Sequence, residues 1–556
     1  MRTLKLALLV VVALAVLPGE VAAGQQTTNL DQVVDRIISR EAAVVASLRQ
    51  YTPLVETYIQ NMRSDNELGA VPAGDNYFLG RADFSDGVVL RSLTEKSGGK
   101  ARRFFGGFGG FFSISMKYLP RGFLQMVFLD TNGFDRSNYK FEYVRREFLG
   151  EVRCLVFDVT PLPKAGKGRF VGRIWVEDQD YTVVRFNGGY TGSTKSSFYF
   201  HFDSWRVNTG PGLWLPAYIY SEESNLQYAL TKRLQFKAQT RLWGYNLGHV
   251  GQEQELSRIL VEAPTPVRDS TETTNDLSPI QAQRVWDRQA EVNVIERLER
   301  IGLLAPRGEV DKVLETVVNN LEVTNNLDIQ PEVRCRVLLT STLESFTVGH
   351  TIVFSRGLID VLPDEPSLAT MVAHELGHVV LGHRIDSQYA FFDRLLFDDK
   401  DTFKHFLFAR EPAEEDAANQ KAIEMLKSSP YKGTLGTAGQ FLQALQTRST
   451  QIPNLVSPHL GNRVPVNFQM VSTTAPTDPK RAAQIVALPL GGRVKVDPWS
   501  NRLEMIKAKP VGSIAEREKM PFEVTPFMPY LTRLGGPQTP AAITATSKPD
   551  AAKKPE

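Results

Sequence analysis

Two histidines and a glutamate stand at metal-ligand spacing in an apolar stretch beyond the middle of the chain. Residues 371–380 contain the pattern H-E-x-x-H, with His374 and His378 four residues apart and Glu375 directly after the first. On an α-helix this spacing places both imidazoles on one face, where they can bind one Zn²⁺. Glu375 could then take a proton from a water molecule that attacks a peptide carbonyl. The pattern predicts metal-dependent hydrolysis.

The residues around this motif favour a buried helix. Residues 363–366 form a helix-start signal, with Asp364 as the expected N-cap. From Leu368 to Gly382, Glu375 is the only acidic or basic residue apart from the histidines. A lone carboxylate in an apolar helix is costly unless a cation lies beside it, and a bound metal would be that cation. The alternative is a core helix with two hydrogen-bonded histidines and a surface glutamate.

A third ligand is expected downstream, because a catalytic zinc site takes three protein ligands and leaves its fourth position open. Residues 410–426 have the Ala, Ile and Leu spacing of a helix, and three glutamates stand near its start, Glu411, Glu414 and Glu415. Their carboxylates are chemically equivalent as zinc ligands, so ligand chemistry alone does not choose among them.

The residues on both sides of the motif resemble a known family. Residues 345–360 are similar to the strand and turn before the zinc helix in the HtpX and BepA type of gluzincin metallopeptidase, a broad family that also contains the CAAX prenyl proteases. The family's third-ligand signature is Glu-x-x-Ala-Asp, and residues 415–419 match it except that Asn419 replaces the Asp. The resemblance covers about residues 280–465.

This resemblance implies zinc bound by His374, His378 and Glu415, with Glu375 as general base. Among the three glutamates, only Glu415 is followed by Ala and Asn three and four residues later. A side chain one helical turn beyond the ligand could hydrogen-bond a ligand imidazole, so Asn419 is the expected supporting residue. Glu411 and Glu414 remain the rival ligands.

Three other histidines and an arginine are weaker candidates. His383 follows His374 by nine residues, which on a continuous helix places it on the side away from the metal. His459 and Arg463 could each donate a hydrogen bond to the transition-state oxyanion, although a loop side chain is more often solvated. His350 is expected in an edge strand before the zinc helix, and such a strand can pair with an extended substrate through main-chain hydrogen bonds.

The first 23 residues have the features of a secretory signal peptide. Arg2 and Lys5 precede an apolar core at residues 6–17, and residues 21–23 fit a small-residue cleavage site. That core is too short for a membrane span, and no other stretch reaches the roughly 18–20 apolar residues required. No cysteine follows the cleavage site for lipid attachment. We therefore expect an exported protein, periplasmic or secreted, with no transmembrane segment in the mature chain.

Charge and cysteine content exclude several kinds of partner and site. Without residues 1–23 the formal net charge falls from +2 to +1, so no overall field favours nucleic acid or an anionic membrane. The two cysteines, Cys154 and Cys335, are too few for a cysteine metal site and fall in different expected domains. We expect two buried free thiols, with a disulfide as the alternative.

The length of 556 residues predicts two or three domains, and composition suggests their limits. The expected fold class is α+β, with a mainly antiparallel, half-barrel-like β domain followed by a mainly helical, zincin-type metallopeptidase domain. The expected segments are a signal peptide at 1–23, a β-rich domain at 24–262, a linker at 263–279, the metallopeptidase domain at 280–470, a β-containing extension at 471–534 and a disordered tail at 535–556.

The β-rich domain is expected to open with one or two amphipathic helices within residues 30–63. Strands enriched in β-branched and aromatic residues are expected at 77–91, 123–129, 140–144, 152–160, 172–177, 181–187, 197–206 and 213–222. A helix followed by successive strands resembles the LolA-like, lipoprotein-sorting half-barrel, mainly on residues 172–177 and 214–216. A generic β-sandwich is the alternative.

A Phe- and Gly-rich segment at residues 102–112 lies within this domain. It could form a mobile flap that contacts acyl chains, a membrane surface or unfolded polypeptide. The alternative is a loop folded back onto its own core, since large aromatic side chains usually find burial within the same chain.

Further elements are expected in the C-terminal half, with helices at 279–304, 310–321 and 437–447 and a hairpin within 492–507.

These features predict a zinc-dependent endopeptidase that acts on polypeptide substrates. A competing hypothesis is a lipid- or lipoprotein-binding, or chaperone-like, module whose metallopeptidase domain is structural or weakly active. The intact Glu375 favours the enzyme, because a structural zinc site does not need a general base.

Overall fold

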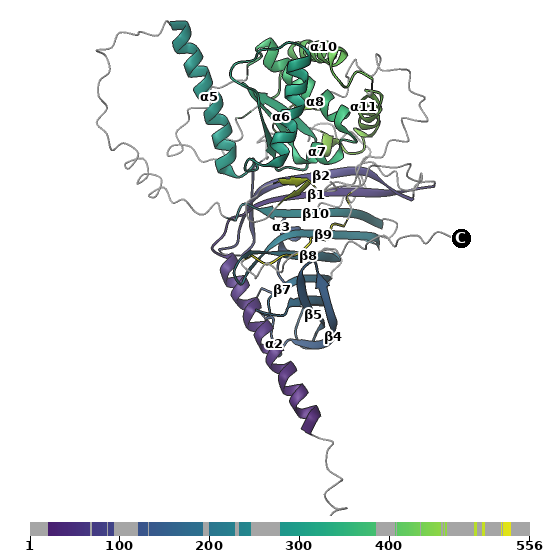
Figure 1. Cartoon of the computed structure of the whole chain (residues 1–556). Helices are drawn as coiled ribbons and strands as arrows, with labels where there is room; N and C mark the ends of the chain where they lie inside the picture. The colour runs from purple at the N-terminus through teal and green to yellow at the C-terminus, as the bar shows by residue number, and fades with distance from the viewer. Residues whose placement is uncertain are drawn as a thin grey trace, which may run out of the picture.

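The computed structural model describes residues 21–93, 120–245, 279–384, 406–456, 460–463 and 524–534, with a few short gaps, together with the strands at 494–496 and 503–505. An antiparallel sheet forms the N-terminal half and helices dominate the C-terminal half, which confirms the predicted α+β class (Figure 1). Residues 1–20, the Phe/Gly-rich segment, His459 and the expected tail lie outside the described residues, as does the expected linker up to residue 278.

The N-terminal half is built on one ten-stranded sheet in the order β3-β2-β1-β10-β9-β8-β7-β6-β5-β4. All its neighbouring strands pair antiparallel. The last strand returns to the first, so that Leu54 lies opposite Trp243. The strands are β1 Leu54–Asp65, β2 Gly69–Asp83, β3 Val89–Ser92, β4 Tyr139–Leu149, β5 Val152–Pro161, β6 Phe170–Glu177, β7 Val183–Tyr190, β8 Phe202–Gly210, β9 Leu213–Gln227 and β10 Arg233–Trp243.

One face of this sheet packs against helices α2 (Val21–Leu48) and α3 (Pro120–Gln125). Along α2 the buried residues Val34, Ile37, Val44 and Leu48 recur at helical spacing and share one hydrophobic cluster with the sheet. The Glu41 carboxylate of α2 crosses this layer to the Arg206 guanidinium of β8, at 2.7 Å with both side chains fully buried. The ion pair and the apolar stripe together hold α2 on the sheet.

The opposite face of the sheet packs against the C-terminal half. Leu54 and Tyr58 of β1 share a hydrophobic cluster with Ile301, Leu303 and Leu339. In Figure 1 the helical part lies beside strands β1 and β2 of the sheet. The sheet therefore lies between α2 on one side and the helical part on the other.

The C-terminal half combines helices with a small four-stranded sheet in the order β11-β13-β12-β14. Strands β11 and β13 pair parallel, and the other two pairs are antiparallel. Its strands are β11 Arg334–Leu338, β12 Glu344–Val348, β13 Thr351–Ser355 and β14 Asn462–Arg463, and its helices are α5 Pro279–Ile301, α6 Glu309–Thr324, α7 Arg356–Val361, α8 Glu365–Leu381, α10 Pro412–Ser428, α11 Gly436–Arg448 and α12 Pro453–Val456.

Several segments of the N-terminal half differ from the prediction. One or two helices were expected within residues 30–63, but α2 ends at Leu48, because Pro53 prevents helical continuation and β1 then pairs with strands on both sides. Residues 123–129 form the end of α3 and a turn instead of a strand. That apolar run is buried whichever backbone it adopts, so its composition did not distinguish helix from strand. Strand β10 was not predicted at all.

Two smaller expectations agree with the structure. Cys154 and Cys335 are buried free thiols. Strands β15 (Val494–Val496) and β16 (Leu503–Met505) pair antiparallel within the expected hairpin. Among the described residues, no helix is both long and apolar enough to cross a membrane.

Candidate metal centre

Helix α8 carries both histidines and Glu375, and capping residues fix both its ends. At its start the Asp364 carboxylate accepts a hydrogen bond of 3.0 Å from the backbone N–H of Ser367, as expected for the N-cap. At its end Gly382 adopts a left-handed conformation with φ of 70°. The three motif side chains are at most 1% exposed. They are therefore held on a rigid, buried helix.

Helix α10 brings Glu415 to the same place because the two helices approach closely. A Cβ atom at Gly377 would lie 2.8 Å from the backbone oxygen of Ala418, so only glycine allows this approach. Ala418 and Ala422 are both fully buried. The small residues on each helix thus set the separation at which the Glu415 carboxylate faces the two imidazoles.

The ligand atoms of His374, His378 and Glu415 converge to within 4.8 Å of one another. The Nε2 atoms of the two histidines lie 3.3 and 3.5 Å from the two carboxylate oxygens of Glu415. Four-coordinate zinc with bonds of about 2.0–2.1 Å separates its ligand atoms by roughly 3.3–3.4 Å. Each imidazole nitrogen therefore lies about as far from the Glu415 carboxylate as two ligand atoms of one zinc ion lie from each other.

The outer nitrogen of each imidazole is engaged, which turns the Nε2 atoms inward. Nδ1 of His374 is 2.9 Å from Oδ1 of Asn419, which lies at the supporting position expected for it. Nδ1 of His378 is 2.9 Å from Nδ1 of His383. The expectation that His383 points away was wrong, because the helix ends at Gly382 and the chain turns back toward His378. Such outer contacts fix the tautomer and orientation of ligand imidazoles.

The charge distribution of the cluster fits a cation. Burial works to lower the pKa of His374, but the carboxylates of Glu415 and Glu375 raise it on balance. Burial works to raise the pKa of Glu415, whereas the two imidazoles outweigh it and lower the pKa to about 2. Nε2 of His378 and Oε1 of Glu415 are buried with no hydrogen-bond partner among the described residues. A divalent metal with N and O ligands would satisfy them, and the donor set is that of a catalytic zinc site.

Two hydroxyl groups of strand β12 hold the Glu375 carboxylate. Ser345 Oγ donates to one carboxylate oxygen and Thr347 Oγ1 to the other, each at 2.6 Å. The two residues alternate along the strand, so both side chains face α8. The sequence analysis did not identify them. Their signal was two hydroxyl residues spaced by two in a short strand, but nothing local indicated which helix the strand faces.

The outer strands of the small sheet are β11 and β14, and His350 is part of neither. His350 stands in the turn between β12 and β13, and β13 is an interior strand, so its expected place in an edge strand was wrong. Among the described residues, β14 pairs with Glu344 and Ser345, and the Thr347 carbonyl farther along β12 accepts a hydrogen bond of 3.0 Å from Arg410.

Arg410 adds a cation to this otherwise acidic region. Burial lowers the pKa of its guanidinium, while Glu375, Glu414 and Glu415 act in the opposite direction. Of the rival ligands, Glu411 is the exposed N-cap of α10 and Glu414 is half-buried, and neither belongs to the convergent group. The backbone of Arg463 lies in β14 opposite Glu344.

Removing both hydroxyl groups is expected to slow turnover without loss of metal. In Ser345→Ala/Thr347→Val the Glu375 carboxylate loses both donors while strand packing is nearly kept. We expect kcat to fall by about 10-fold to 100-fold, since small misplacements of reacting groups have effects of this size. Steady-state kinetics and metal analysis check this. Thr370→Val is the matched control, because it removes a buried α8 hydroxyl that bonds the backbone of its own helix. An unchanged kcat in the double variant would contradict the positioning role.

Comparison with known proteins covers part of this region. Residues 306–397 match the model of peptidase family M48. The match includes β12 and the whole of α8 and ends before Glu415. No curated protein matches the chain.

Two solved structures are similar to part of the chain. One is a LolA superfamily protein from Nitrosomonas europaea, at 12% identity and a TM-score of 0.20, covering 38% of this chain and 91% of that one. The other is a DUF1329 family protein from Desulfovibrio piger, at 11% identity and a TM-score of 0.18, covering 40% of this chain and 98% of that one. TM-scores this low support no inference about the ligands of this chain.

Proposed function

We propose, from the premise that this chain carries a metallopeptidase domain of family M48, that it is a zinc-dependent endopeptidase. The single observation that carries the proposal is the convergence of two imidazoles and one carboxylate near a fourth group, the separately held carboxylate of Glu375. The first three suit a metal, and the fourth suits a base. A structural metal site would not need that fourth group.

Each residue has a distinct task in this proposal. His374, His378 and Glu415 would hold the zinc ion. When bound, zinc supplies Lewis acidity to the attacking water and to the scissile carbonyl. Glu375 accepts the proton of that water and returns it to the amine that leaves. Ser345 and Thr347 fix the direction in which the carboxylate presents its oxygens.

The substrate in this proposal is a polypeptide in extended conformation. Among the described residues the pairing of β12 with β14 ends at Ser345, so an added strand could pair with the backbone of Thr347 on the outer side of β12. The same strand carries the hydroxyls that hold Glu375, so a peptide paired there lies close to the base. Arg410 donates a hydrogen bond to the Thr347 carbonyl, and a paired peptide would have to replace this hydrogen bond.

We further propose that the protein acts outside the cytoplasm, in the periplasm or after secretion. Support comes from the basic start, the apolar core and the small-residue site within residues 1–23.

Removing the metal is expected to abolish hydrolysis reversibly. After chelation and dialysis, the full chain should cleave an unfolded protein such as reduced casein at least about 100-fold more slowly, because the Lewis acid is absent. One equivalent of Zn²⁺ should restore the rate, and Mg²⁺ should not, since imidazole ligands suit zinc and Mg²⁺ prefers oxygen. Circular dichroism of the stripped protein controls for unfolding. Unchanged cleavage after verified zinc removal would contradict the proposal.

A further inference from the structure

We propose that Glu56, on strand β1 of the N-terminal sheet, is a positioning residue for the peptidase site. It acts through residues 339–343, here named the docking loop, which leads directly into β12. The kinetic part of this inference rests on the proposed function, whereas its structural part does not.

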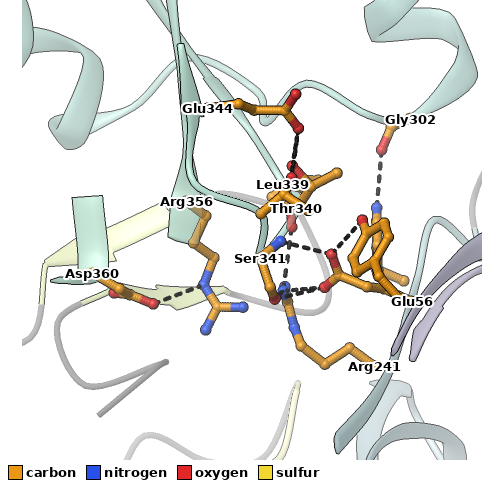
Figure 2. Close-up of polar contacts among 12 residues, drawn as sticks. Glu56, Arg241, Gly302, Leu339, Thr340, Ser341, Glu344, Arg356 and Asp360 are labelled. Carbon is orange, nitrogen blue, oxygen red and sulfur yellow. Dashed lines mark hydrogen bonds and ion pairs between the residues drawn. The ribbon is translucent and has the colours of Figure 1, made fainter. Parts of the chain in front are cut away.

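The Glu56 carboxylate is buried between the two halves of the chain and accepts hydrogen bonds from the docking loop. It is 1% exposed. Its oxygens accept hydrogen bonds from the backbone N–H of Ser341 at 2.6 Å and from the Ser341 hydroxyl at 2.7 Å (Figure 2). The Tyr77 hydroxyl donates to it at 2.8 Å and the Arg241 guanidinium at 3.0 Å. Two donors come from the sheet and two from the loop, so this one group joins the two halves.

Arg241 of β10 extends the same contact along the loop. Its guanidinium donates to the Leu339 carbonyl and to the Ser341 hydroxyl, each at 3.2 Å. Burial lowers the pKa of Arg241, and the Glu56 carboxylate opposes that shift. Next to it, the Trp243 indole donates to the Gly302 carbonyl at 3.0 Å. A buried pair of charges is costly unless both are fully bonded, so this arrangement is sensitive to the loss of either partner.

The docking loop continues into the residues that hold the base. Ser345 stands only four residues after Ser341, a span of at most about 14 Å of extended chain. Between them, Glu344 accepts a hydrogen bond of 2.5 Å from the Thr342 hydroxyl and one of 3.0 Å from the Leu460 backbone. This short, hydrogen-bonded segment has little conformational freedom, so the position of Ser341 sets that of Ser345 and Thr347.

The three candidate metal ligands lie on α8 and α10, whereas Ser345 and Thr347, which hold the Glu375 carboxylate, lie on β12. Loss of the Glu56 contact should therefore disturb the base more than the metal. Substitution of a residue whose only role is to stabilise the fold would not affect turnover and zinc binding to different extents.

The test compares Glu56→Gln with Glu41→Gln in the full chain. Glu41 is a matched control because it is also a buried carboxylate paired with an arginine of the sheet, but it belongs to α2, which covers the opposite face of the sheet. We expect Glu56→Gln to lower kcat by about 10-fold with one zinc retained. Glu41→Gln should lower thermal stability about as much as Glu56→Gln does, but it should leave kcat within about 2-fold of wild type.

A double-variant comparison tests the route through β12. In the Ser345→Ala/Thr347→Val background the base has already lost its donors, so adding Glu56→Gln should change kcat by less than about 2-fold. A further full 10-fold loss there would show that Glu56 acts by another route and overturn the inference.

Hydrogen exchange supplies a readout that needs no substrate. Amides of residues 341–348 should exchange at least about 10-fold faster in Glu56→Gln than in wild type, and at the wild-type rate in Glu41→Gln. This measurement tests the positioning role even if the wild-type protein shows no hydrolysis. Absence of hydrolysis would contradict the proposed function but not the positioning role. Unchanged exchange in Glu56→Gln, or equal increases in both variants, would overturn the inference.

Discussion

Glu375→Gln is expected to abolish peptide hydrolysis while the protein keeps its zinc. Glutamine fills the same space and can still contact Ser345 and Thr347, but it cannot accept the proton of the attacking water. Loss of a general base costs up to about 10⁴-fold, so we expect a fall in kcat of at least about 10³-fold. Cleavage of an unfolded protein, measured together with zinc content, checks this.

The matched control is Glu365→Gln, which removes a carboxylate from the first turn of the same helix. It should retain most of the activity. Substantial turnover by Glu375→Gln, in a preparation free of other proteases, would exclude Glu375 as the base.

Glu415→Ala is expected to lose zinc, whereas Glu411→Ala is not. Both residues lie at the start of α10, but only the Glu415 carboxylate faces the two imidazoles. Removing even a hydrogen-bond partner of a ligand costs about 10-fold to 100-fold in affinity, so loss of the ligand itself should exceed about 100-fold. Competition against a zinc chelator measures both variants. Normal affinity in Glu415→Ala with weak binding in Glu411→Ala would reverse the assignment.

The helix that carries the motif could be predicted because its signals are local. The N-cap Asp364, the apolar run and the histidine spacing all lie within one segment, and the structure reproduces its start. The place of Glu415 depended instead on a resemblance to the family, since its sequence neighbours offered equivalent carboxylates. What selects it in the structure is the close approach of two helices at Gly377, which no local pattern reveals.

The groups that support the base could not be predicted because they come from distant parts of the chain. Ser345 and Thr347 reach Glu375 from a strand some thirty residues earlier, and Glu56 meets Ser341 across 285 residues. Pairing of β10 with β1 is equally non-local. Such contacts depend on how the faces of helices and sheets and the edges of strands pack together. Sequence periodicity shows only which face of an element is apolar. His383 was misplaced for a simpler reason, since Gly382 was not read as the end of the helix.

The most direct test of the central claim is an anomalous difference map at the zinc absorption edge, from crystals of the full chain grown with one equivalent of Zn²⁺. We expect a single strong peak about 2.0–2.2 Å from Nε2 of His374, Nε2 of His378 and a carboxylate oxygen of Glu415. The Glu375 carboxylate should lie beside the peak without binding the metal. A map with no peak at this position, or with the peak bound by Glu411 or Glu414 in place of Glu415, would contradict the account.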